Sequence, residues 1–261
     1  MARNVHQAAR DACLWLPEAE EFLSHGSPNF RVRGKTFATY VVNHHGDGRV
    51  ALWLNALPGS QELYVREQPE HFFVPPYVGP RGWLGVILDQ GIAWKRVVSL
   101  VREAYEKVAP ADLRARIGKT PMLNGPDAPL SPSQIDPLKS KRALAVLGPL
   151  REMCLRLPES REQRQFGHPV WQAGKKTFAL VRYDGTRLTL CFWVGVDQQG
   201  LLTEDPRYQI PPYMGHNGWI ALDVSENCDW REIESLTMNS YRHFALKRML
   251  QQLSESRTQS N

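Results

Sequence analysis

The stretch "VPPYVGPRGWLGVILDQGIAW" at residues 74–94 returns later in the chain as "IPPYMGHNGWIALDVSENCDW" at residues 210–230. Both segments share Pro-Pro-Tyr, a glycine, Gly-Trp, an apolar run and a final tryptophan. Their offset never changes, since 212 − 76 = 136, 219 − 83 = 136 and 230 − 94 = 136. Self-similarity at a fixed spacing indicates a repeated structural unit, so this repeat decides the fold before any single helix or strand is considered.

The repeat continues on both sides of this stretch. The further matching segments are "LPEAEEFLSHGSPNFRVRGKTFA" (16–38) with "LPESREQRQFGHPVWQAGKKTFA" (157–179), "RVALWLNA" (49–56) with "LTLCFWVG" (188–195) one residue out of phase, and "WKRVVSLVREAYEKV" (94–108) with "WREIESLTMNSYRHF" (230–244). The tryptophans pair accordingly: Trp53, Trp83 and Trp94 with Trp193, Trp219 and Trp230, while Phe30 pairs with Trp171.

A proline-rich segment separates the two copies. Five prolines lie between residues 118 and 137. Because proline removes a backbone donor and blocks helix formation, this segment is predicted to be an extended linker. The predicted organisation is a first domain at 1–117, a linker at 118–140, a second domain at 141–252 and a disordered tail at 253–261.

Each copy has the same predicted order of elements. In the first copy a helix over about 5–16 precedes a hairpin with Gly34 at its turn and the apolar strand "VALWL". A short helix, two strands around the Pro-Pro-Tyr turn and a closing helix with the 3.6-residue apolar period follow. This order, α-β-β-β-α-β-β-α, predicts an α+β fold in which helices pack on an antiparallel sheet, present twice.

Composition indicates a soluble globular protein, because 42% of the 261 residues are hydrophobic and 23% are charged. No apolar run is long enough for a membrane helix, and the N-terminus meets charge too early for a secretory signal. The four cysteines lie far apart, which favours reduced thiols in the cytoplasm over a zinc site. We therefore expect a cytoplasmic protein without a metal or cofactor. The net charge of +5 permits nucleic-acid binding without requiring it.

The repeated motifs resemble those of the MmcQ/YjbR family. They are Leu-Pro-Glu, Gly-x-Pro, Gly-Lys-x-Phe-Ala, Pro-Pro-Tyr-Val-Gly-Pro-x-Gly-Trp and a helix that begins with tryptophan, over residues 5–115 and again 143–250. The resemblance implies a fold like that of type III secretion chaperones and a double-wing DNA-binding role. Members usually hold one such domain and supply no catalytic residues to carry over. One founding member is associated with an antibiotic biosynthesis cluster, which implies a role near small aromatic molecules.

Two loops in each copy are candidate wings. In "FRVRGKTFA", Arg31, Arg33 and Lys35 alternate and are predicted to point the same way, and the second copy offers Lys175 and Lys176. These residues could contact nucleic-acid phosphates, or they could be the solvated charges of an ordinary hairpin.

The Pro-Pro-Tyr turn is the other wing. Its Tyr77, Arg81 and Trp83 could stack on bases and touch phosphate, or the turn could be a rigid corner without a ligand. The second copy keeps Tyr213 and Trp219 but has Asn217 in place of Arg81. If the turn binds phosphate, the two copies have therefore diverged.

Aromatic residues support an alternative function. An aromatic cleft between or within the domains would suit a planar small molecule, as in a sequestration or resistance protein. The candidate ligand-binding residues are Phe30, Tyr77, Trp83, Trp171, Tyr213 and Trp219. Such side chains more commonly fill a core, so both interpretations remain open.

Catalytic motifs are missing from the sequence, and Ser27 of "GSP" becomes His168 of "GHP" in the second copy. We therefore expect a binding protein rather than an enzyme. His44 and His45 lie in a hairpin tip without a counterpart in the second copy. This difference predicts a monomer whose domains form a pseudo-two-fold pair, with one copy more specialised for its ligand.

Overall fold

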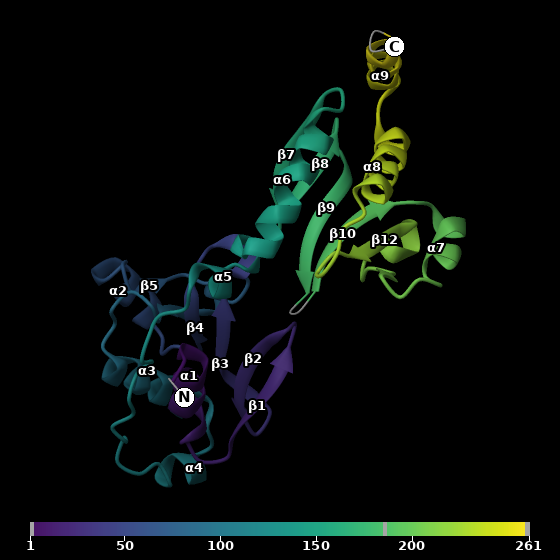
Figure 1. Cartoon of the computed structure of the whole chain (residues 1–261). Coiled ribbons are helices and arrows are strands. Elements are labelled where there is room, and N and C mark those ends of the chain that lie inside the picture. The colour runs from purple at the N-terminus through teal and green to yellow at the C-terminus, as the bar shows by residue number, and fades with distance from the viewer. Residues whose placement is uncertain (1–2, 185–186, 259–261) are drawn as a thin grey trace. The chain divides into compact units, whose positions relative to one another are not determined.

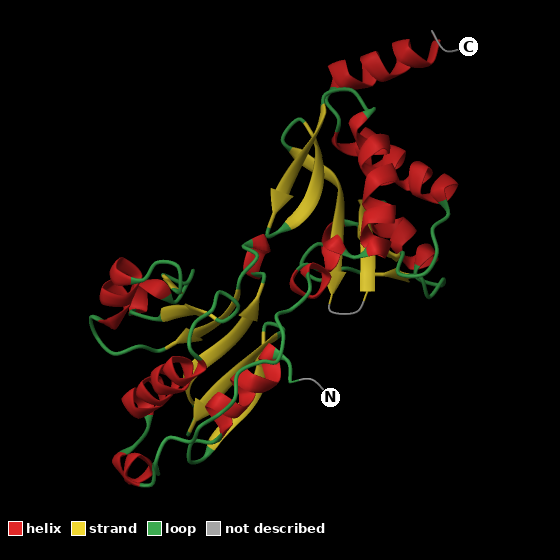
Figure 2. Cartoon of the chain, turned by 60° about the vertical axis from the view of Figure 1, so that its left-hand side comes forward, coloured by secondary structure: helices red, strands yellow, loops and turns green. Residues whose placement is uncertain are grey.

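The computed structural model describes residues 3–184 and 187–258 (Figure 1). The chain divides into two compact units, Met1–Ile135 and Asp136–Asn261. Each unit contains a six-stranded antiparallel sheet and its own helices (Figure 2). The predicted fold class, α+β with two similar halves, is therefore confirmed.

The first unit has strand order β1-β2-β3-β4-β6-β5. Its elements are α1 (Val5–Leu14), β1 (Ala19–Ser24), β2 (Ser27–Val32), β3 (Lys35–Val42), η1 (His44–Gly46), β4 (Val50–Leu54), α2 (Ser60–Glu67), β5 (Phe72–Phe73), η2 (Gly79–Arg81), β6 (Leu84–Ile87), α3 (Trp94–Val108), α4 (Ala111–Ala115) and α5 (Pro132–Ile135).

The second unit repeats this topology as β7-β8-β9-β10-β12-β11. Its elements are η3 (Pro137–Lys139), α6 (Lys141–Leu155), β7 (Ser160–Gln165), β8 (His168–Ala173), β9 (Lys176–Asp184), β10 (Arg187–Trp193), α7 (Val196–Leu202), β11 (Tyr208–Gln209), η4 (Gly215–Asn217), β12 (Trp219–Asp223), α8 (Trp230–Phe244) and α9 (Lys247–Thr258).

Strands β1 and β7 are absent from the predicted order of elements. Each is an edge strand that pairs with one neighbour, β2 or β8. Their sequences, "AEEFLS" and "SREQRQ", are too polar to show the apolar alternation of a half-buried strand. Charged side chains on an edge discourage pairing with other chains, so the composition that hides these strands suits their position.

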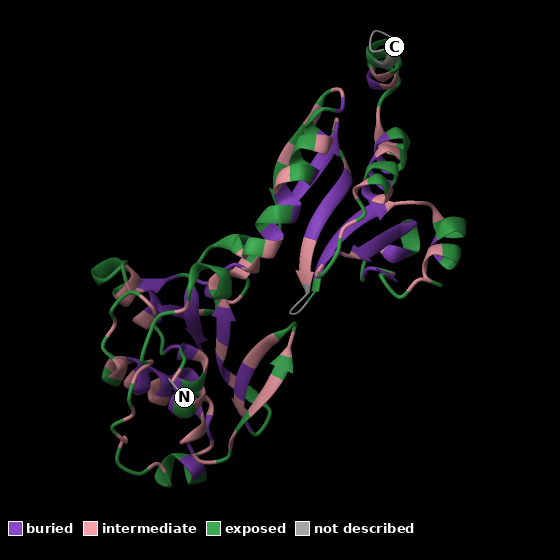
Figure 3. Cartoon of the chain, in the orientation of Figure 1, coloured by how far each residue is buried: buried purple, intermediate pink, exposed green. Residues whose placement is uncertain are grey.

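Within each unit, the motifs that the two copies share contact one another. The Tyr105 hydroxyl of α3 donates to the Pro17 carbonyl at 2.5 Å, and the Tyr241 hydroxyl of α8 donates to the Pro158 carbonyl at 2.7 Å. The ring of Tyr105 meets Phe37 edge-on, with 5.4 Å between centroids. The leucine, the Phe-Ala pair and the helix tyrosine of these motifs are therefore buried together in each core. Figure 3 shows the buried residues of each unit mainly along its strands.

A second apolar cluster lies on the other face of each sheet. In the first unit it includes Trp53, which lies opposite Gly85 in the strand register. The second unit has Cys191 opposite Ala221 at this position. The predicted pairing of Trp53 with Trp193 is therefore wrong. Trp193 lies opposite Trp219, two residues further along β10, because the preceding hairpins differ in length.

The proline-rich segment packs against the first unit instead of running free. Leu123 and Leu130 contact the first core, and Gly125 lies against the ring of Trp94. The Asp127 N–H donates to the Arg3 carbonyl at 2.9 Å, and the Arg3 N–H donates to the Asp127 carboxylate.

The predicted disordered tail at 253–261 is helical as far as Thr258, and 259–261 lie outside the described residues. Helix α9 is anchored by Met249, which is wholly buried in the second core. A short amphipathic helix with a single buried anchor gives little apolar periodicity, which explains why the sequence did not predict it.

Candidate functional site

The two predicted wings of each unit lie at the same end of its sheet. Val32 pairs with Lys35 around the β2–β3 turn, and Lys35 begins β3. The Asn55 N–H, just beyond β4, donates to the Phe37 carbonyl at 2.9 Å, and Leu54 pairs with the first residue of β6. Only β4 lies between β3 and β6, the two strands that follow the wings.

We call this end of each unit the wing end. It comprises residues 33–35 and 77–83 in the first unit, and 174–176 and 213–219 in the second. The register of the second unit is equivalent, since Ala173 pairs with Lys176 and Trp193 with Trp219. The topology therefore brings together two loops that lie about forty residues apart in each copy.

The last turn of α3 joins the first wing end. Lys107 Nζ donates to Asn55 Oδ1 at 2.8 Å and to the Ala56 carbonyl at 2.6 Å. In the second unit, Leu246 lies beside Gly174, so the segment that connects α8 to α9 also reaches the wing hairpin. In the first unit, Lys107 of the closing helix is thus added to the basic residues of the wings.

Ion pairs distinguish the predicted cations. Arg31 Nε lies 2.7 Å from Glu20, and Arg33 lies 3.0 Å from Glu18 and 3.2 Å from Asp112. The hydrogen bond from Arg33, followed by one from Arg116, lowers the pKa of exposed Glu18. The charge on Arg31 and Arg33 is therefore partly matched within the unit.

Four other predicted cations are exposed and form no ion pair within residues 3–184 and 187–258. They are Lys35, Arg81, Lys175 and Lys176. The prediction that Arg31, Arg33 and Lys35 point the same way is wrong. Arg31 lies opposite Thr36 whereas Lys35 lies opposite Val32, so the two side chains are on opposite faces. Arg33 lies in the turn with φ +46°, where strand alternation is interrupted.

The Pro-Pro-Tyr corner presents an exposed tyrosine from a strained backbone in both units. Tyr77 has φ +63° and Tyr213 has φ +67°, and their exposed fractions are 67% and 88%. The Val78 N–H also donates to the Pro76 carbonyl at 2.7 Å, which makes a tight turn around Tyr77. A bulky residue in the left-handed region is uncommon, and such strain concentrates at functional sites.

A buried glutamine holds each corner in place. Gln61 Nε2 donates to the carbonyls of Gly79 and Trp83 at 2.8 and 2.5 Å. Gln199 does the same in the second unit, to the carbonyls at 215 and 219 at 2.7 and 2.6 Å. Neither glutamine was predicted from the sequence. Their signal is a glutamine in each short helix before the corner, at an offset of 138.

The histidine insertion touches the corner of the first unit. His45 Nε2 lies 2.8 Å from the Tyr77 hydroxyl, and the His44 ring meets Trp53 edge-on with 4.9 Å between centroids. Burial, followed by the neighbouring His45, lowers the pKa of His44. The insertion therefore covers part of the second apolar cluster. The matching tip of the second unit includes residues 185–186, which lie outside the described residues.

Most of the predicted ligand-binding aromatic residues belong to the cores. Phe30 and Trp171 are wholly buried, and Trp83 and Trp219 are 9% and 7% exposed. Only Tyr77 and Tyr213 present their rings to solvent. An aromatic ligand surface made from these six residues is therefore reduced to two tyrosines on separate corners.

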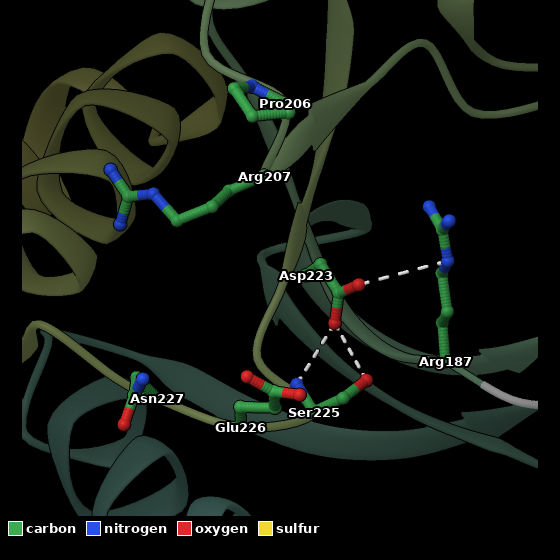
Figure 4. A pocket seen from close by; sticks show the side chains of 7 residues that line it. All are labelled: Arg187, Pro206, Arg207, Asp223, Ser225, Glu226 and Asn227. Atoms are coloured by element: carbon green, nitrogen blue, oxygen red, sulfur yellow. Dashed lines mark hydrogen bonds and ion pairs between the residues drawn. The ribbon is translucent and has the colours of Figure 1, made fainter.

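A polar cleft of about 350 Å³ lies in the second unit (Figure 4). Arg187 and Asp223 face each other across it at 3.8 Å, and Asp223 also accepts a hydrogen bond from Ser225. The guanidinium of Arg207 points away toward Asp205 and Glu232. Arg187 begins β10 and Trp193 ends it, so the cleft lies at the opposite end of the sheet from the wing end.

Residues 3–184 and 187–258 contain no group of three His, Cys, Asp or Glu side chains that could hold a metal ion. No helix in this part of the chain is long and apolar enough to cross a membrane. Cys13 and Cys154 are wholly buried, and burial raises the pKa of both thiols.

The fold and its corners define a tandem α+β protein with two equivalent wing ends. The family model described as YjbR matches residues 14–107 and again 155–243. The chain therefore belongs to the YjbR family and carries two copies of its domain. The crystal structure of Deinococcus radiodurans protein DR2400, with a DUF419 domain, is similar at 19% identity and a TM-score of 0.37. That similarity covers 44% of this chain and 88% of that one. No curated protein matches the chain.

Proposed function

We propose that this protein is a non-enzymatic nucleic-acid-binding protein that contacts the phosphate backbone through its wing ends. The observation that carries the proposal is the position of exposed cations at the wing end of each sheet, on both loops in the first unit and on the hairpin in the second. Lys35 and Arg81 supply these cations in the first unit, and Lys175 and Lys176 supply them in the second. Phosphate contacts need basic side chains at loop tips, where no neighbouring element obstructs the approach of a long polymer.

Ion pairing within the unit decides which cations are available to bind phosphate. A phosphate must compete with Glu18 and Asp112 for Arg33, but no carboxylate among the described residues pairs with Lys35 or Arg81. We therefore assign the phosphate contacts of the first unit to Lys35 and Arg81, with Arg33 as a weaker contributor.

The assignment as a binding protein rests on what the two units share. Their wing ends have in common an exposed tyrosine, exposed cations and a rigid corner, and these groups bind rather than react. Ser27 and His168 occupy equivalent positions, so a serine nucleophile is not common to both units. A shared catalytic mechanism would require a nucleophile and a base in each copy.

Fluorescence anisotropy with labelled single-stranded and duplex DNA tests this function. Binding should weaken as salt rises from about 50 to about 200 mM, with a log–log slope of about −0.9 per phosphate contact on duplex DNA. The double variant Lys35→Gln/Arg81→Gln should bind more weakly and lower the slope by about 2. Lys95→Gln is the matched control, because Lys95 is exposed at the far end of α3, about 20 Å from Lys107.

Two results would overturn the proposal. One is the absence of binding to either DNA at low salt. The other is an equal loss of affinity in the control variant and the wing variant, which would make the interaction a property of net charge alone.

A further inference from the structure

Three of the equivalent positions at which the wing ends of the two units differ change the chemistry of the side chain. In the first unit these residues are Asn55, Arg81 and Lys107, and in the second they are Trp193, Asn217 and His243. The offset is 136 for two pairs, since 217 − 81 = 136 and 243 − 107 = 136. The third pair follows from the strand register of each unit. Asn55, directly after β4, occupies the position in the first unit that Trp193, opposite Trp219, occupies in the second. The second unit therefore exchanges two cations and an amide for an indole, an imidazole and an amide.

The new aromatic residues form an ordered stack. The ring of His243 lies on the indole of Trp193, with 3.4 Å between centroids and 11° between planes. The Trp193 Nε1–H donates to the Asn217 carbonyl at 2.9 Å, and its backbone N–H donates to Ser240 Oγ at 3.0 Å. The indole is therefore fixed against the corner, and it holds the imidazole in a defined orientation.

The stack is accessible from outside the protein. His243 is exposed and Trp193 is half-buried, so the imidazole forms the outer layer. Tyr213 presents an 88% exposed ring from the same corner. Lys175 and Lys176 lie across the sheet end on the wing hairpin, where they could hold a phosphate backbone. Aromatic faces beside a cationic track are the combination that binds single-stranded nucleic acid.

We propose that the wing end of the second unit binds an unpaired nucleobase by stacking it on His243, with Trp193 beneath, and that the protein therefore prefers single-stranded nucleic acid. This inference rests on the proposed function and adds the class of ligand. A base inside a duplex has both faces covered by its neighbours, so it cannot add to the stack. The first unit has Lys107 at this position and contacts phosphates alone.

Three substitutions at one exposed position separate stacking from charge. His243→Ala removes the ring, His243→Tyr keeps an aromatic face, and His243→Lys installs the cation of the first unit. The probes are oligothymidylate, an abasic oligonucleotide of the same length and the corresponding duplex. Thermal melting of each variant verifies that it is folded.

Stacking predicts that oligothymidylate binds more tightly than the abasic strand and the duplex. His243→Ala and His243→Lys should each lose at least about fivefold in affinity for oligothymidylate, whereas His243→Tyr should retain it. His243→Ala and His243→Tyr should not change affinity for the abasic strand, and His243→Lys should increase it slightly.

The results that would overturn the stacking site differ from those that would overturn nucleic-acid binding. Equal binding of oligothymidylate and the abasic strand, or unchanged affinity in His243→Lys, overturns the stacking site and leaves phosphate binding intact. Binding to none of the three probes overturns the nucleic-acid function itself, and with it this inference.

Discussion

Replacing Gln61 with leucine tests whether one buried side chain holds the shape of the corner. Gln61 is 8% exposed, and its amide donates to two buried carbonyls, those of Gly79 and Trp83. Leucine has similar volume and no donor, so the Trp83 carbonyl loses this partner, whereas the Gly79 carbonyl keeps its bond from the Gly82 N–H at 2.9 Å. An unsatisfied buried group costs about 1–3 kcal/mol, the lost bond at Gly79 costs about 1 kcal/mol, and the added apolar burial offsets about 1–2 kcal/mol. We expect the first unit to lose about 1–2 kcal/mol of stability.

Urea denaturation followed by tryptophan fluorescence measures this loss, and Gln199→Leu should give a similar loss in the second unit. Gln68→Leu is the matched control, because Gln68 is exposed at the end of the same short helix, and it should change stability by less than about 0.5 kcal/mol. Amide hydrogen exchange at residues 78–82 should accelerate only in the Gln61 variant. A loss no larger than that of the Gln68 control, or unchanged exchange at the corner, would refute the assignment of the corner's rigidity to this glutamine.

Three further changes follow from the same structure. Tyr105→Phe removes the bond to the Pro17 carbonyl and should cost about 1 kcal/mol in urea denaturation; a neutral result would mean that water replaces it. Because Arg33 lowers the pKa of Glu18, this pair stabilises the fold at pH values above the ordinary carboxyl pKa, and the stabilisation is lost as pH falls through the lowered pKa. In Arg33→Gln, the urea midpoint should therefore fall less steeply as the pH is lowered, and an unchanged pH dependence would contradict this. Tyr213→Gly relieves a left-handed backbone and should stabilise the second unit by up to about 1 kcal/mol while weakening nucleic-acid binding; destabilisation would show that the tyrosine packs rather than binds.

The architecture could be predicted from the sequence because the repeat supplies two different sequences that adopt the same fold. Where one copy is ambiguous, the other restricts the answer, as with the Trp94 and Trp230 helices, both of which begin at the tryptophan. The edge strands β1 and β7 were not predicted, because an edge strand buries too little of either face to require apolar residues.

The candidate site was predictable only in part. The wings and their cations were identified from composition and turn residues, but their meeting at one sheet end depends on β4 lying between β3 and β6. No local pattern states which strands are neighbours in a sheet. The Trp193–His243 stack was equally hidden, because the apparent match of Trp53 with Trp193 conceals that the latter has no aromatic counterpart in the first unit.

The corner explains how two copies could keep one shape and present different chemistry. Gln61 and Gln199 bind backbone carbonyls, so the corner needs no particular side chain at its tip. Glycines at 79 and 215 are required instead, since a Cβ there would collide with the side chain of Val74 or Ile210. Arg81 and Asn217 are therefore able to differ without a change of backbone. A duplicated domain that fixes its binding loop through main-chain contacts can specialise that loop in one copy while the stability of the fold stays the same.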